Sequence, residues 1–121
     1  MVYKKSWKYI LTKDNTHYCD FGCYVLKALK DFSDVTKGDF GGYVQGYRNL
    51  SQEGNCWIYD YAEILGFANI SESARIYGHA QVGGNAQISG NTWIIGKAVI
   101  SGNAKISKNI IIPRTCTRFI F

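Results

Sequence analysis

Ile or Val recurs at every sixth position over the second half of the chain. Ten consecutive hexads run from Asn55 to Arg114, and the fourth residue of each is aliphatic: Ile58, Ile64, Ile70, Ile76, Val82, Ile88, Ile94, Ile100, Ile106 and Ile112. The second residue is small in every hexad except the one that carries Ile110, and Gly closes six of the ten. A short fixed period of this kind predicts a stack of repeated structural units.

The alternation inside a hexad predicts a short β-strand. Positions two and four, which hold the small and the aliphatic residue, share one face of an extended chain, and positions three and five share the other. Gly at position six supplies the backbone freedom that a corner needs. Strands of this length, joined by regular corners, coil into a parallel β-solenoid whose coils pair at about 4.8 Å spacing. The sequence therefore predicts an all-β solenoid with a narrow interior column of Ile and Ala.

A second pattern pairs an aliphatic residue with a small residue four positions later, as in Ile58/Ala62, Ile76/Ala80 and Ile100/Ala104. In this pattern the chain resembles the hexapeptide-repeat proteins, which fold as left-handed parallel β-helices. Gly here falls two residues after the aliphatic residue, as at Gly102, and the segments 38–43, 49–51 and 54–59 are more similar to small polymer-forming-like repeat proteins common in phages and prophages. The resemblance covers residues 24–112.

The resemblance implies three hexads per coil, so that residues eighteen apart lie above one another. The outward positions support this spacing, because it sorts them by chemical type. One face would carry Trp57, Tyr59, Arg75, Tyr77, Trp93 and Ile95, here called the aromatic face, and would continue to Ile111. A second face would stack Asn69, Gln87 and Lys105, and the third would stack Glu63, Gln81 and Val99.

Residues 1–36 lack the hexad and are predicted to form an antiparallel β-hairpin that caps the first coil. Trp7–Leu11 alternates, a turn signal follows at residues 13–16, and residues 24–29 read as a second strand, although a short helix also fits their spacing. A cap is expected because an open coil end exposes unpaired backbone groups. Residues 37–114 form the solenoid, and 37–54 are its degenerate first coil, marked by Phe40, Val44 and Leu50.

Residues 115–121 form an apolar tail of the same single domain. The tail either folds over the last coil or contacts another subunit, and an exposed apolar patch favours the subunit contact. The residues expected in this self-association are Ile111, Phe119, Ile120 and Phe121. The chain is accordingly expected to form a homo-oligomer.

Charge is distributed unevenly along the chain, whose net charge is +5. Residues 38–72 hold five acids against one Arg, whereas residues 73–121 hold no acid and six basic residues, which are Arg75 and a basic patch of Lys97, Lys105, Lys108, Arg114 and Arg118. This asymmetry favours head-to-tail contacts between copies of the chain, or the binding of an acidic partner such as nucleic acid. Of the possible partners, nucleic acid is less favoured than a protein. An unevenly charged solvated surface is the alternative.

No run approaches the ~20 apolar residues that span a bilayer, and no apolar leader is seen, so a location in the cytoplasm of a bacterial host is expected. The four Cys are then expected to be reduced thiols. His17, Cys19 and Cys23 lack the spacing of a zinc site, and we expect neither a metal nor a cofactor.

His79 is the candidate catalytic residue, because hexapeptide-repeat enzymes are commonly acyltransferases that use a His as general base. It is the only His in the repeat, and no neighbouring carboxylate is evident to orient it, which favours a plain corner residue. Phosphate-binding, serine-hydrolase and zinc-protease motifs are absent from the sequence. The sequence therefore predicts a protein that is not an enzyme, with an acyltransferase as the alternative.

The aromatic face is the candidate partner-binding surface, because Trp, Tyr and Arg are frequent anchors of protein interfaces. Packing of these side chains on each other, or under the N-terminal hairpin, is the structural alternative. The resemblance to phage proteins implies an accessory protein that inhibits a host complex by contact, for instance an anti-CRISPR that blocks a CRISPR–Cas effector. A self-assembling structural module is the third functional class.

Overall fold

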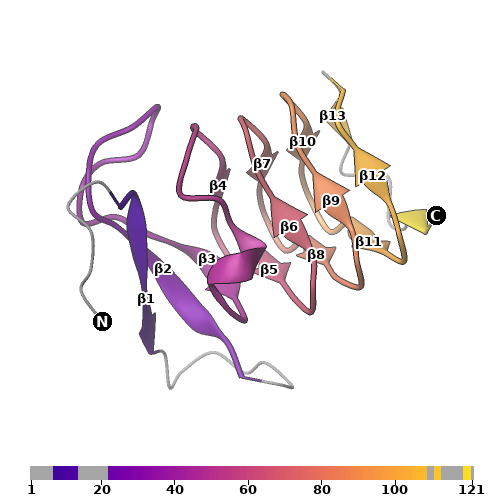
Figure 1. Ribbon diagram of the computed structural model, residues 1–121, viewed down its shortest axis with the longest axis horizontal. Helices are drawn as coiled ribbons and strands as arrows, with labels where there is room; N and C mark the ends of the chain where they lie inside the picture. The colour runs from indigo at the N-terminus through magenta and orange to yellow at the C-terminus, as the bar shows by residue number, and fades with distance from the viewer. Residues whose placement is uncertain (1–6, 14–21, 109–110, 113–118, 121) are drawn as a thin grey trace.

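The computed structural model describes residues 7–13, 22–108, 111–112 and 119–120. The chain winds into a parallel β-solenoid whose coils stack along one axis, with the N-terminal strands at one end (Figure 1). Residues eighteen apart pair in register, as Trp57 does with Arg75 and Arg75 with Trp93. The predicted all-β solenoid with three hexads per coil is confirmed.

Three sheets form the sides of the solenoid. The first contains seven strands in the order β1 (Tyr9–Lys13), β2 (Tyr24–Ala28), β3 (Phe40–Val44), β5 (Glu63–Ile64), β8 (Gln81–Val82), β11 (Val99–Ser101) and β14 (Phe119–Ile120). The second has the order β13 (Ile111–Ile112), β10 (Trp93–Ile94), β7 (Arg75–Ile76) and β4 (Trp57–Ile58). The third has the order β12 (Lys105–Ile106), β9 (Gln87–Ile88) and β6 (Asn69–Ile70).

The interior is the predicted column of aliphatic and small side chains. Fourth-position residues such as Ile64, Ile88 and Ile100 are inaccessible to solvent, and so are the second-position Ala residues. Thr92 occupies one small position, and its hydroxyl lies 2.8 Å from the carbonyl oxygens of both Ser89 and Lys108, to either of which it can donate its single proton. Because each coil repeats the same contacts, burial and backbone pairing hold every coil to its neighbours in the same way.

Two corners of the solenoid hold an acid where Gly is usual. Asp60 and Glu72 both have φ 58, in the left-handed region. Their carboxylates accept hydrogen bonds from the backbone N–H of Gly78 at 3.0 Å and of Gly90 at 2.7 Å, one coil further on. These two acids therefore stabilise the stacking of successive corners.

The first coil departs from the regular repeat. Val44 pairs with Ile64 and Leu50 with Ile70, and a short 3-10 turn, η1 (Tyr47–Asn49), lies between them. The buried Asn49 accepts from the N–H of Gln45 and donates to the carbonyl of Ala68 at 2.8 Å. Its amide thus replaces backbone pairing that the irregular turn cannot make. Of the three residues that mark this coil in the sequence, Val44 and Leu50 are buried, whereas Phe40 is 65% exposed.

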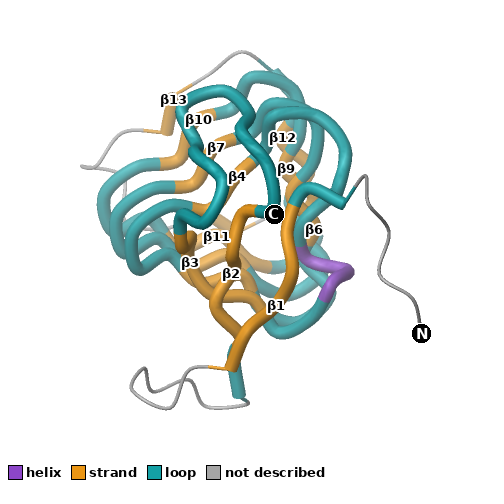
Figure 2. Tube along the Cα trace, turned by 90° about the vertical axis from the view of Figure 1, so that its left-hand side faces the viewer, coloured by secondary structure: helices purple, strands orange, loops and turns teal. Residues whose placement is uncertain are grey.

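β1, β2 and β3 form an antiparallel meander across the start of the solenoid (Figure 2), which confirms the predicted cap and the strand rather than the helix at residues 24–28. The outer edge of β1 is covered by a side chain. Gln52 accepts from the N–H of Lys8 at 2.7 Å and of Tyr9 at 3.2 Å, and donates to the Tyr9 carbonyl at 3.1 Å. This edge is therefore protected from pairing with another strand.

At the other end, β14 pairs in parallel with β11, so that Phe119 lies beside Ile100. The backbone of Phe119 and Ile120 therefore continues the sheet of its own chain. Of the two alternatives for the tail, the pairing of β14 with β11 corresponds to the fold-back over the last coil, and the contact with another subunit stays a prediction. Phe121 lies outside the described residues.

Cys56 is a free, buried thiol at a small inward position, whereas Cys23 is disulfide-bonded. The expectation of four reduced thiols is therefore wrong for Cys23. No group of His, Cys, Asp or Glu within the described ranges is placed to hold a metal ion, and His17 and Cys19 lie outside these ranges. The described part of the chain also contains no helix of the length and apolar character needed to cross a bilayer.

Candidate functional site

The aromatic face lies on the sheet β13-β10-β7-β4. The Tyr59 and Tyr77 rings stack with centroids 4.3 Å apart and an interplanar angle of 16°. Tyr77 in turn contacts Trp93 at 5.9 Å, and the Arg75 guanidinium lies over the Trp93 ring at 5.5 Å from its centroid. The side chains of the aromatic face therefore form a ladder, a continuous series of ring and cation contacts in which each side chain holds its neighbours in place.

The loop between β2 and β3 covers the N-terminal part of this face. Phe32 packs edge-on against Trp57 at 5.2 Å. The two residues after Phe32 reach further along the ladder, because Ser33 accepts from the Arg75 guanidinium and Asp34 accepts from the Tyr59 hydroxyl at 2.7 Å. The cap loop thus fixes the positions of Tyr59 and Arg75.

Trp57 requires a correction. It was expected on the outer surface with the rest of the aromatic face, but it is 2% exposed, against 38% for Trp93. Phe32 and Tyr9 contact its ring, and β3 passes close to it at Gly41, where an added Cβ would lie 2.8 Å from the indole. Trp57 therefore joins the cap to the first coil, and its side chain is not accessible to a binding partner.

Beyond the covered part, the face opens into a shallow hollow of about 570 Å³. Tyr77, Trp93, Ile95 and Ile111 supply its apolar walls, and we call these four residues the open end of the aromatic face. Asp60 lies at the rim, where its carboxylate is fixed by Gly78. The hollow is thus a mainly apolar depression that opens to solvent.

Burial, the hydrogen bond to Asp34 and the nearby Tyr77 together raise the pKa of the Tyr59 phenol above its ordinary value of 10.0. Tyr59 is therefore a neutral hydrogen-bond donor at physiological pH. The hydrogen bond from its hydroxyl holds Asp34, and with it the cap loop, against the aromatic face.

His79 lies at a corner outside the hollow. Its exposed imidazole stacks on the Tyr61 ring at 5.2 Å with an angle of 13°. Among the described residues, no carboxylate forms a hydrogen bond with it, so the geometry holds no oriented acid–base pair here.

The described lysines of the predicted basic patch surround the last coil. Lys97 lies at the corner before β11, Lys105 lies in β12 on a different sheet, and Lys108 follows β12. Arg114 and Arg118 lie outside the described residues. Of the residues expected in self-association, Ile111 is 60% exposed at the edge of the hollow.

Four residues of this region did not emerge from the sequence: Phe32, Ser33, Asp34 and Asp60. Asp60 could have been found, because it stands at a sixth position that is usually Gly. The other three lie in a tight turn closed by the Phe32–Val35 bridge, with Ser33 at φ 50. Nothing in a single sequence indicates that this turn folds against residues 25 to 42 positions later.

No known protein-family profile matches the sequence. A segment of 49 residues, 40% of this chain, is 49% identical to an uncharacterised acetyltransferase, YdcK, of Escherichia coli (strain K12). The matched segment makes up 15% of that relative's length, so the chain corresponds to only a small part of it. The chain is therefore a β-solenoid with partial similarity to this acetyltransferase.

Proposed function

We propose that this protein works by binding another protein at the open end of the aromatic face, without catalysing a reaction. The observation that carries the proposal is an exposed Trp93 that Tyr77 and Arg75 hold in place beside an apolar hollow. Ring and cation contacts order these side chains before any partner arrives. Binding to a pre-ordered surface loses less side-chain entropy, and interface energy concentrates on such Trp, Tyr and Arg anchors.

The test is affinity capture with matched double variants. The wild type, Tyr77→Ala/Trp93→Ala and the control Gln87→Ala/Lys105→Ala are used as bait in host-cell lysate. The control removes two exposed side chains from the sheet β12-β9-β6, away from the aromatic face. Binding of each captured protein is then measured with purified components. We expect the aromatic variant to bind at least about 30-fold more weakly, since the loss of even one anchor of about 2 kcal/mol weakens binding by that factor.

Thermal unfolding of all three proteins serves as the folding control. The substituted side chains point outward, so the three proteins should retain the same secondary structure. A partner that binds the aromatic variant as tightly as the wild type would contradict the proposed surface, and equal weakening by the control variant would do the same.

A narrower form of the proposal identifies the partner as a complex of bacterial defence, such as a CRISPR–Cas effector, that the protein blocks sterically. It is supported by the resemblance of segments 38–43 and 54–59 to phage repeat proteins. Plasmid interference in cells that carry one such effector tests it. The wild type should relieve interference and Tyr77→Ala/Trp93→Ala should not, whereas unimpaired interference by every effector tried would reject this narrower form.

Acyl transfer is the second candidate, and the partial match to an acetyltransferase favours it. His79 would then act as the base that deprotonates the acceptor, with Tyr61 holding its ring. Acetyl-CoA should raise the unfolding temperature, and release of free CoA should be lost in His79→Ala. The absence of both effects in the wild type would eliminate this candidate.

A further inference from the structure

Lys8 and Cys56 form a buried pair that joins the residue before β1 to the residue before β4. Lys8 is 1% exposed, and Cys56 is inaccessible to solvent. The Lys8 ammonium group donates a hydrogen bond to the sulfur of Cys56, with 3.3 Å between nitrogen and sulfur. A free thiol and an amine are therefore held at the separation of atoms about to react, which is about 3–3.5 Å.

Backbone and ring contacts fix both side chains of this pair. The Lys8 ammonium group also donates to the carbonyl oxygens of Gly54 at 3.2 Å and Cys56 at 2.8 Å, and it lies 5.0 Å from the centre of the Phe32 ring. The Cys56 thiol is hydrogen-bonded to the carbonyl oxygen of Ser51 at 3.6 Å. The nitrogen and the sulfur therefore keep their separation while the protein is folded.

Burial sets the reactivity of the two groups. It lowers the pKa of Lys8, which increases the fraction of neutral, nucleophilic amine. It raises the pKa of Cys56, and the charge of Lys8 only partly offsets this rise. Oxidation of the thiol is therefore slow, because the thiolate is the reactive form, whereas an oxidised sulfur has an amine beside it as soon as it forms.

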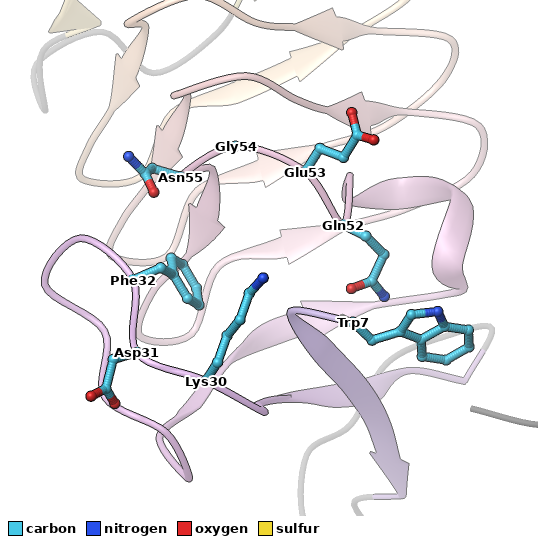
Figure 3. A pocket seen from close by; sticks show the side chains of 8 residues that line it. All are labelled: Trp7, Lys30, Asp31, Phe32, Gln52, Glu53, Gly54 and Asn55. Atoms are coloured by element: carbon cyan, nitrogen blue, oxygen red, sulfur yellow. The ribbon is translucent and has the colours of Figure 1, made fainter. Parts of the chain in front are cut away.

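A second hollow, of about 720 Å³, gives a small oxidant a route to the pair. Its walls come from three segments: Trp7 before β1, residues 30–32 after β2, and residues 52–55 before β4. Figure 3 shows residues 52–55 on one side of the hollow and the Phe32 and Lys30 side chains on another. Because Gly54 and Phe32 line this hollow and also contact Lys8, one layer of residues separates the hollow from the pair.

We propose that Lys8 and Cys56 are a site of oxidative cross-linking, at which hydrogen peroxide joins the Lys8 nitrogen to the Cys56 sulfur in a reversible sulfenamide bond. Peroxide transfers one oxygen to the thiol, which becomes a sulfenic acid, and its other oxygen leaves as water. The neutral Lys8 amine then attacks the sulfur, the S–O bond breaks, and the hydroxyl group leaves as a second water with a proton from the nitrogen. Sulfenic acids condense in this way with backbone nitrogen, and an amine is the stronger nucleophile.

The bond makes the attachment of the cap sensitive to oxidation. It closes a loop between positions 48 residues apart, and β1, β2, β3 and η1 all lie within this loop. A covalent link across a long loop restricts the unfolded chain and so stabilises the folded one. Oxidation should therefore raise the unfolding midpoint by about 5 °C or more and slow the exchange of the β1 amide hydrogens.

The test is peptide mapping by mass spectrometry of the full chain, before and after treatment with millimolar hydrogen peroxide. We expect the peptides of Lys8 and Cys56 to appear as one linked product, lighter than their sum by two hydrogen atoms. Two equivalents of a thiol reductant should separate them again and restore the original unfolding midpoint. A midpoint that the link leaves unchanged would contradict the effect on the cap.

Lys8→Arg and Lys30→Arg are the matched variants, because each keeps its positive charge and loses its nucleophilic amine. Lys30 lines the hollow, so Lys30→Arg should form the link as the wild type does. Lys8→Arg should form none, and its sulfenic acid at Cys56 should react with dimedone at least about tenfold more than that of the wild type. Thermal unfolding without peroxide checks that both variants fold.

Cys56→Ala places at this position the residue that the following coil has at Ala74, and it should abolish the link without disturbing the column. Four results would each overturn the proposal: a Cys56 thiol that peroxide leaves unchanged, sulfinic acid at Cys56 without the linked product, a disulfide from Cys56 to another cysteine, or the linked product in Lys8→Arg. Loss of the link in Lys30→Arg would assign the amine to Lys30 and overturn it as well.

Discussion

Residues 59–108 repeat one set of contacts from coil to coil, whereas most contacts of residues 7–13 and 22–57 occur only once. In the first region, the regular coils, aliphatic side chains stack on their equivalents and backbone groups pair in register. In the second, the cap region, single polar side chains such as Gln52, Asn49 and Lys8 satisfy the backbone. Repetition therefore holds the coils together, and individual side chains hold the cap to them.

The proposed partner surface begins where these two regions meet. The cap loop covers one end of the aromatic face and leaves Tyr77 and Trp93 open. The same loop forms one wall of the hollow around Lys30. The regular coils supply a rigid platform, and the cap decides which part of it is accessible.

The largest expected effect concerns the regular coils. Ile88→Ala should lower the free energy of unfolding by about 3 kcal/mol, because it opens a cavity in a column that cannot collapse. Ile76→Ala should cost about the same, because Ile76 is likewise flanked in its stack by Ile on both sides, Ile58 and Ile94. Urea denaturation measures both. A cost below about 1 kcal/mol at either position would show that the column is not what holds the coils.

Corner geometry gives the next effect and offers an adjacent control. Gly84 has φ +64, and an added Cβ would lie 2.9 Å from the backbone of Gly102. Gly84→Ala should therefore cost about 2 kcal/mol. Gly83→Ala should be neutral or slightly stabilising, since its Cβ would meet only Leu65 at 3.9 Å. Equal unfolding midpoints for the two variants would contradict the role given to the corner.

In the cap, Gln52→Ala should cost about 1–2 kcal/mol, because it leaves backbone groups of Lys8 and Tyr9 without partners. The exposed edge of β1 should also exchange its amide hydrogens faster and favour association of chains. Hydrogen exchange and light scattering measure these effects. Glu53→Ala, the adjacent exposed position, is the control, and unchanged exchange at β1 in Gln52→Ala would refute the edge protection.

The smallest effect is a sensitivity to alkali that belongs to the cap region. Burial raises the pKa of Tyr9 above its ordinary value of 10.0 and that of Cys56 above 9.0. Each group keeps its proton longer in the folded state, so the free energy of unfolding falls as pH rises past these values. Burial lowers the pKa of Lys8 below its ordinary value of 10.5, so this group has the opposite effect: it raises the free energy of unfolding as pH rises. This rise is complete by pH 10.5.

Above pH 10.5, therefore, the free energy of unfolding should fall as pH rises. Tyr9→Phe should make this fall less steep by up to about 1.4 kcal/mol per pH unit. Denaturation at a series of pH values measures the slope. The same slope in Tyr9→Phe and the wild type would mean that Tyr9 does not contribute, and a stability that rises above pH 10.5 would contradict the sign.

The same division explains how much could be predicted from the sequence. The hexad is local and repeats, and together with the three hexads per coil that the resemblance implies, it predicts that Trp57, Arg75 and Trp93 lie above one another. Packing under the hairpin is one of the alternatives that the sequence leaves open for Trp57. The sequence cannot decide it, because the burial depends on Phe32 and Gly41, which the chain brings to Trp57 once through long-range packing. The hollow around Lys30 was missed for the same reason, since it joins three segments that share no pattern.

The claim that a protein partner binds at Trp93 is tested most directly by site-specific photo-crosslinking. A photoreactive phenylalanine analogue is placed at position 93 and, as the matched control, at position 87, which is also exposed but lies on the sheet β12-β9-β6. We predict that position 93 captures the partner in a covalent adduct and that position 87 does not. Equal adducts at both positions, or an adduct only at position 87, would contradict the claim.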